Sequence, residues 1–267
     1  MTSSDIKLKP WVEPLARIGY SARGVIYLII GVFAVLAAIG SGEEKGSRDA
    51  LQTLLAQPFG AILVWLLIAG LSGYFIWRFV QATLDSDGHG TSVKALVIRG
   101  GLLVSGITYG ALAIYALSLT GILSGGGSSG SKGQIAGYLA RFIGNAAVSL
   151  GLGLIMLVVG GAHFWKAYKH KYAKHFDREA AKMKFVHWVS IIGLTARGLV
   201  FVVLAVMFYY RFMNAADSPS DPSLKNALQF VQDLPFGWFL LSLLGLGLIA
   251  FSAYSFSEAR WRHIHPT

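Results

Sequence analysis

Six stretches of this chain are almost free of charge, and each is long enough, or nearly so, to cross a membrane. They lie near residues 16–40, 58–80, 98–123, 142–163, 186–212 and 235–257. A helix of about 20 residues spans the hydrocarbon core of a bilayer. Apolar residues make up 54% of the 267 positions and charged residues 13%, which leaves too little charge for the surface of a soluble protein. The sequence therefore predicts an all-α polytopic membrane protein with six transmembrane helices.

The distribution of Lys and Arg predicts how the chain lies in the membrane. With six spans, both termini and the second and fourth connections share one side, which holds 17 of the 23 Lys and Arg residues. The positive-inside rule places that side in the cytoplasm. Both termini are therefore expected there. The net charge of +10 then reflects topology rather than nucleic-acid binding, because no soluble basic domain exists to carry it.

An internal repeat divides the chain. Glycines five residues apart recur in “GYSARG” (19–24), “GLLVSG” (101–106) and “GLTARG” (193–198). Each is followed in order by “FVQA” (79–82), “FWKA” (164–167) or “FSEA” (256–259). We therefore expect three units of two helices each, at residues 11–90, 91–176 and 177–262.

Three tandem pairs of membrane helices with “SARG” and “TARG” elements resemble the bacterial family catalogued as domain of unknown function 1206. The resemblance covers about residues 11–262, although the middle unit has “LVSG” in place of the arginine form. It implies a multi-pass protein of the bacterial cytoplasmic membrane. It implies no catalytic residue.

The units are expected to be parallel, because each begins and ends in the cytoplasm. Parallel repeats are related by an axis along the membrane normal, so the sequence predicts a pseudo-threefold bundle of six helices. A row of three hairpins is the alternative. Glycine lets helix backbones approach closely, and Gly24 and Gly198 are expected to be contact points between spans because their equivalents recur in every unit.

The segments between the spans offer little room for chemistry. Residues 50–56 and 224–233 form short amphipathic stretches, each leading into Pro-Phe-Gly, and are expected along the outer interface. Residues 124–133 are interpreted as a plain linker. Residues 166–184 are expected to continue the fourth helix into the cytoplasm, where their basic side chains either set topology or meet anionic lipid or an acidic partner.

The spans show no set of residues typical of a catalytic or metal site. The chain has no cysteine, which excludes disulfides and thiolate metal sites. Of the histidines near the cytoplasmic side, His163 alone approaches membrane depth, so a bis-histidine haem site is not expected. No nucleophile–base set lies within the spans. The sequence therefore predicts neither a cofactor nor a metal, and no catalytic residue can be named.

Arginines set into the opening turns of apolar spans are the strongest candidates for a site. A charge within the membrane costs about 2.5–3.5 kcal/mol on insertion scales and tends to face the bundle interior or water. The alternative is that each side chain extends to the cytoplasmic interface, which we favour for Arg17 and Arg99. Both alternatives stay open for Arg23 and Arg197. The candidate ligand-binding residues are Arg17, Tyr20, Ser21, Arg23, Tyr27, Arg99, Thr195 and Arg197.

Two functions are compatible with these residues. One is a binding or accessory protein with a cytoplasm-facing basic pocket for an anionic lipid, a ligand or a partner membrane protein. The other is a small-solute or anion transporter or channel along the repeat axis. No Asp or Glu lies in the core of any span as bounded above, which disfavours proton or cation coupling. Membrane lipids are the expected partners, and nucleic acid is not.

Overall fold

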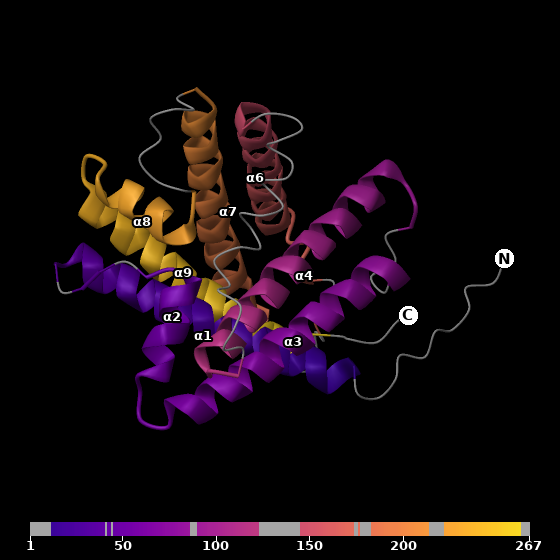
Figure 1. Ribbon diagram of the computed structural model, residues 1–267. Coiled ribbons are helices and arrows are strands. Elements are labelled where there is room, and N and C mark those ends of the chain that lie inside the picture. Colours follow the sequence, from indigo (N-terminus) through magenta and orange to yellow (C-terminus); the bar gives the residue numbers. More distant parts are fainter. Residues whose placement is uncertain are drawn as a thin grey trace.

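The computed structural model describes residues 12–40, 42–43, 45–85, 90–122, 145–173, 176, 183–213 and 222–262. These form eight helices and no β-strand. The helices are α1 (Val12–Ala38), α2 (Ser47–Leu55), α3 (Gly60–Leu84), α4 (Val93–Leu119), α6 (Asn145–Tyr168), α7 (Met183–Met213), α8 (Leu224–Gln232) and α9 (Gly237–Trp261) (Figure 1).

Six of these helices are long and apolar enough to cross a membrane, which confirms the predicted number of spans. They are α1, α3, α4, α6, α7 and α9. The predicted boundaries differ from the observed ones by a few residues, and the largest consequence is at the end of the chain. There α9 continues to Trp261 rather than ending at residue 257, so the sixth span includes Glu258.

Helix α1 packs against α9, and these two form the centre of the molecule. On one side α3 packs against α1 and α4 against α3, whereas on the other α7 packs against α9 and α6 against α7 (Figure 1). Among the described residues, α4 and α6 make no extended contact with each other. The structure therefore does not show the expected closed, pseudo-threefold bundle. It does not show a row of three hairpins either, because the two helices of the middle unit lie apart.

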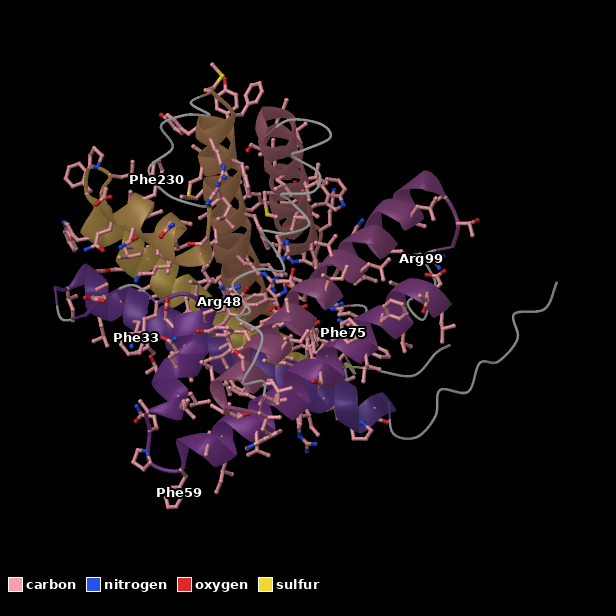
Figure 2. The ribbon with its side chains drawn as sticks, in the orientation of Figure 1. Phe33, Arg48, Phe59, Phe75, Arg99 and Phe230 are labelled. Atoms are coloured by element: carbon pink, nitrogen blue, oxygen red, sulfur yellow. The ribbon has the colours of Figure 1, made fainter. Side chains whose placement is uncertain are left out.

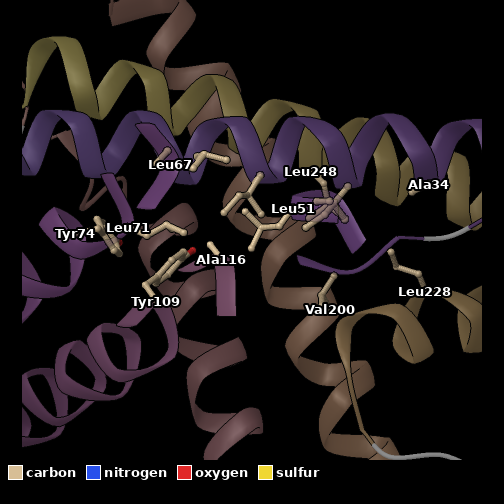
Figure 3. Packing of buried hydrophobic residues seen from close by; sticks show 14 of the residues in the cluster. Ala34, Leu51, Leu67, Leu71, Tyr74, Tyr109, Ala116, Val200, Leu228 and Leu248 are labelled. Atoms are coloured by element: carbon tan, nitrogen blue, oxygen red, sulfur yellow. The ribbon is translucent and has the colours of Figure 1, made fainter. Parts of the chain in front are cut away.

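The short helices α2 and α8 cover the end of the bundle at which α3 and α9 begin. Leu51 of α2 and Leu228 of α8 are fully buried. Figure 3 shows both reaching into the core, close to Ala34, Val200 and Leu248. The amphipathic stretches recognised in the sequence are thus helices, and burial of their apolar faces holds them on the bundle.

A Pro-Phe-Gly turn joins each short helix to the span that follows. Phe59 and Phe236 adopt left-handed backbone conformations, with φ of 61° and 59°. A Cβ on Gly60 would lie 2.0 Å from the carbonyl oxygen of Leu55, and one on Gly237 would lie 1.8 Å from that of Gln232. Only glycine fits there. The turns expose the phenylalanines, and Figure 2 shows Phe59 at an outer tip, where it is 79% exposed.

Glycines inside the spans mark the closest helix contacts, as the sequence predicted for Gly24 and Gly198. A Cβ on Gly24 would lie 2.9 Å from the ring of Phe256, and one on Gly198 would lie 2.8 Å from the ring of Phe164. Both contacts join helices of different units, α1 to α9 and α7 to α6. The missing side chain is therefore what lets these helices meet.

The connection after α6 does not continue as the helix that the sequence predicted. Helix α6 ends at Tyr168, and His170 turns the chain through a left-handed conformation with φ of 49°. Tyr172 and Phe176 are then buried against the beginning of α7 and the end of α9. Burial raises the pKa of Tyr172 to about 12. The hydroxyl of Tyr172 is protonated at neutral pH and can donate a hydrogen bond to Nδ1 of His187, 2.7 Å away.

The predicted linker at residues 124–133 lies outside the described residues, as does most of the basic stretch from 174 to 182. The unit boundaries stay a prediction.

Candidate functional site

Arg23 lies inside the bundle, where α1 meets α3 and α9, and is only 2% exposed. Its Nε donates to the hydroxyl of Ser255 at 3.0 Å, and one terminal nitrogen donates to the hydroxyl of Tyr74 at 2.7 Å. The other terminal nitrogen forms an ion pair with Glu258. Of the two orientations left open by the sequence, the structure therefore shows the inward one for Arg23.

Glu258 is an acid within a span, which corrects the expectation that the spans contain none. It lies in the last turn of α9, is 1% exposed, and binds Arg23 with one oxygen and Arg262 with the other. Hydropathy placed the end of the sixth span before this residue because a charge normally lies outside the membrane. Two arginines compensate the charge here, so the helix continues past it.

Arg197 lies on α7 and has very different surroundings. Its guanidinium carbon lies over three aromatic rings, at 5.2 Å from the centroid of Tyr27, 5.5 Å from Phe201 and 4.7 Å from Phe251. No hydrogen bond or ion pair joins it to another described residue, and its Nε is buried without an acceptor. Among the described residues, the contacts of the partly buried Arg197 guanidinium are therefore with aromatic rings rather than with hydrogen-bond acceptors.

Arg23 and Arg197 share a neighbour. The guanidinium carbon of Arg23 lies 5.1 Å from the centroid of Phe251, the same ring that Arg197 approaches to 4.7 Å. The two arginines of “SARG” and “TARG” therefore lie in one region of the bundle interior and do not point separately to lipid.

Further basic side chains join this region, which we call the basic cluster. Arg78 donates to the hydroxyl of Tyr74 and to the side-chain oxygen of Gln81. The ammonium group of Lys166 lies 2.9 Å from the hydroxyl of Tyr254. With Glu258 as its acid, the basic cluster comprises Arg23, Arg78, Lys166, Arg197 and Arg262. Its positive charge exceeds its negative charge.

Arg17 and Arg99 are not part of the basic cluster, although the sequence grouped them with it. Arg17 pairs with Glu13 and donates to the carbonyl oxygens of Ala259 and Arg260 at 2.7 and 2.9 Å. In the same way Arg99 donates to the carbonyl oxygens of residues 82 and 83, at 2.6 and 2.9 Å. Cations at these positions satisfy the last carbonyls of a helix and its dipole. Figure 2 shows Arg99 near the end of α3, far from the bundle centre.

The remaining predicted site residues divide between the two groups. The ring of Tyr20 lies 5.1 Å from the guanidinium carbon of Arg23, and its hydroxyl accepts a hydrogen bond from Trp77 at 3.0 Å. Tyr27 lies beneath Arg197. By contrast, Ser21 bonds to the carbonyl oxygen of Arg17 within its own helix, and Thr195 is partly buried on α7 without a hydrogen bond to another described residue.

Sequence reasoning missed Glu258, Lys166 and Gln81, although one signal connects them. Each is the third residue of a closing string, “FSEA”, “FWKA” or “FVQA”. Two of them are buried and the third is partly buried. A polar residue recurring at one position of an apolar repeat could have indicated that this position faces the interior.

Comparison with known proteins identifies the family of the chain. The model of the family described as Domain of Unknown Function (DUF1206) matches residues 18–85 and 192–262, which hold α1 to α3 and α7 to α9. The chain is also similar to the uncharacterized protein YxxB of Bacillus subtilis (strain 168), at 31% identity over 99% of this chain and 96% of the relative. No solved structure matches. The chain therefore belongs to the DUF1206 family.

Proposed function

We propose that this protein binds an anionic group in the basic cluster, which faces the cytoplasm. The group would be the headgroup of a lipid, a small acidic ligand or an acid of a partner membrane protein. The observation that carries the proposal is Arg197, whose buried Nε has no acceptor.

Energetics support a missing partner for Arg197. Placing a charge within a membrane costs about 2.5–3.5 kcal/mol on insertion scales. Each cation–π contact returns about 0.5–2 kcal/mol, and three rings surround this guanidinium. The contacts therefore make the charge tolerable, but the buried Nε has no acceptor among the described residues. A bound oxyanion would satisfy them with charge-assisted hydrogen bonds.

Removing the donor tests the proposal. Protein extracted from bacterial membranes is expected to retain an anionic species in native mass spectrometry. Arg197→Gln should lower its affinity about 10–100-fold, since a hydrogen bond to a charged group contributes about 1.5–3 kcal/mol. Arg197→Lys should weaken it less, because the charge remains but the two-pronged geometry is lost.

The matched control is Arg99→Gln, which removes an arginine that caps α3 outside the basic cluster. It should leave the retained species unchanged. Equal retention by wild type and Arg197→Gln would contradict the proposal.

The cytoplasmic orientation of the basic cluster is part of the proposal and can be measured separately. The chain has no cysteine, so single cysteines report without background. Glu43→Cys, in the exposed first connection, should react with a membrane-impermeant maleimide added to cells stripped of their outer barrier. Lys169→Cys, exposed after α6, should react only after the membrane is opened. The reverse pattern would place both termini outside.

Anion transport is the second candidate function. Intramembrane ionisable residues commonly mark transport paths, and the basic cluster is a group of such residues with an excess of positive charge. In the sequence, the lack of an acid within the spans counted only against proton or cation coupling and left an anion path open. In sealed vesicles the protein should then speed the flux of an anion, and Arg197→Gln should slow it. Flux equal to that of empty vesicles would leave binding as the function.

A further inference from the structure

Arg23 and Arg197 occupy matching places in two sets of helix contacts. Gly24, the residue after Arg23, meets Phe256 of α9, and Gly198, the residue after Arg197, meets Phe164 of α6. The pair α9 and α1 is therefore packed in the same register as the pair α6 and α7.

The helix on the other side of each arginine also matches. A Cβ on Gly19 would lie 2.6 Å from Cβ of Tyr74, and one on Gly193 would lie 2.5 Å from Cα of Phe251. One turn further along, a Cβ on Gly70 would lie 2.7 Å from the methyl group of Ala22, and one on Gly247 would lie 2.3 Å from that of Ala196. The pair α1 and α3 is thus packed in the same register as the pair α7 and α9.

Because the helices pack in the same register, each partner of Arg23 has a residue at the equivalent position beside Arg197. Glu258 follows Phe256 by two residues, and Lys166 follows Phe164 by two. Ser255 and His163 each precede those phenylalanines by one. Tyr74 corresponds to Phe251, which has the same ring but no hydroxyl.

Every acceptor of Arg23 is therefore replaced by a group that accepts no hydrogen bond from Arg197. The carboxylate becomes an ammonium, and the tyrosine hydroxyl becomes a ring hydrogen. The serine hydroxyl becomes an imidazole whose Nδ1 lies 2.8 Å from the carbonyl oxygen of Val159. Lys166 donates to the hydroxyl of Tyr254.

We infer that the place filled beside Arg23 by the carboxylate of Glu258 is, beside Arg197, the binding place of an external oxyanion, a carboxylate or a phosphate. The inference rests on the proposed function and specifies its site, between α6 and α7 and next to Phe251. The ion pair of Arg23 with Glu258 is then an example, in the same molecule, of how Arg197 would hold a bound oxyanion.

The chemistry of the place suits such a group. Three rings lie against the guanidinium of Arg197, and its N–H edge has no partner among the described residues. The edge of a guanidinium donates hydrogen bonds to two oxygens of one carboxylate or phosphate at once. Lys166 carries three rotatable donors on a flexible stem, so its ammonium can turn from Tyr254 towards a second negative charge, which favours phosphate.

Building the missing acid into the chain tests the assignment. Lys166→Glu places a carboxylate where Glu258 stands beside Arg23, and Lys166→Gln, which creates the residue found at position 81, is the matched control. The melting temperature of the full-length protein would be measured in neutral detergent with two additions. One is inorganic phosphate, with chloride as its reference, and the other is phosphatidylglycerol, with phosphatidylcholine as its reference.

For the wild type we expect the melting temperature to rise with phosphate, with phosphatidylglycerol or with both, and the more effective one identifies free phosphate or a lipid headgroup as the source. Lys166→Glu should melt higher than Lys166→Gln without any addition and should lose the anion-dependent rise. Phe251→Tyr, which restores the hydroxyl found at Tyr74, should reduce that rise even if Lys166→Glu does not fold.

If anions raise the melting temperature of every folded variant at positions 166 and 251 as much as that of the wild type, the assignment is wrong. If that rise is instead lost in Arg78→Gln, the proposed function stands and only this place for the anion is wrong. No rise in the wild type with either anion would contradict the proposed function itself.

Discussion

Glu258→Gln is expected to lower the free energy of unfolding by about 3–5 kcal/mol, the usual cost of removing one partner from a buried ion pair. Glutamine keeps the shape of the side chain but not its charge. Arg23, at 2% exposure, would then remain buried without the carboxylate that it pairs with, and Arg262, at 4% exposure, would lose its bond to the same carboxylate. Because α1 and α9 form the central contact of the molecule, the loss should appear as a lower melting temperature of the whole bundle.

The control for this effect is a second Glu–Arg pair in the same chain. Glu13 and Arg17 form an exposed pair one helical turn apart, with both side chains 35% exposed. Exposed pairs contribute about 0–1 kcal/mol, so Glu13→Gln should change the melting temperature little. Equal melting temperatures for the two variants in detergent would mean that Glu258 is not buried as an ion pair.

Gly193→Leu is expected to destabilise the protein by about 3 kcal/mol, at the upper end for overpacking a tight contact. A Cβ at this position would lie 2.5 Å from both Cα and the backbone nitrogen of Phe251. Backbone atoms cannot rotate away as a flexible side chain can, so α7 and α9 would have to separate. The ring of Phe251 would move with them, and anion binding at Arg197 should weaken as well.

Gly161→Ala provides the opposite case within another span. No atom lies within 4 Å of a Cβ added there, and alanine favours a helix over glycine by up to about 1 kcal/mol. The variant should therefore unfold at the same temperature as wild type or slightly above. A loss comparable to that of Gly193→Leu would show that any change at a helical glycine is harmful, which would remove the packing argument.

The number of spans and the two covering helices could be predicted from the sequence because each depends on a local pattern. A run of about 20 apolar residues forms a membrane helix whatever surrounds it. Likewise, the spacing of apolar residues at positions 50–56 and 224–233 is a property of the segment itself. The glycine contacts of Gly24 and Gly198 were predictable for a related reason, since the repeat showed which positions carry a shared constraint.

The arrangement of the spans was not predictable in this way. Parallel units are compatible with a closed ring, with a row of hairpins and with the observed order, in which α4 and α6 lie apart. Which helices pack depends on side-chain fit between segments far apart in the chain, such as Phe164 with Gly198. Hydropathy does not record that fit.

Two errors, after α6 and at the end of α9, have a common physical origin. Residues 166–184 contain no helix breaker, so local preference predicted a continuous helix, yet burial of Tyr172 and Phe176 turns the chain after Tyr168. Glu258 was placed outside its span because a lone charge would be. In both cases a tertiary contact outweighed the local preference.

Density for the bound group would test the central claim most directly. A map of the protein reconstituted in a bilayer with anionic lipid, detailed enough to show side chains, is expected to show an oxyanion within hydrogen-bond distance of the Arg197 guanidinium, between α6 and α7. In the same map of Lys166→Glu, the introduced carboxylate should occupy that place. A wild-type map in which a side chain of the protein itself fills the N–H edge of Arg197 would contradict the account.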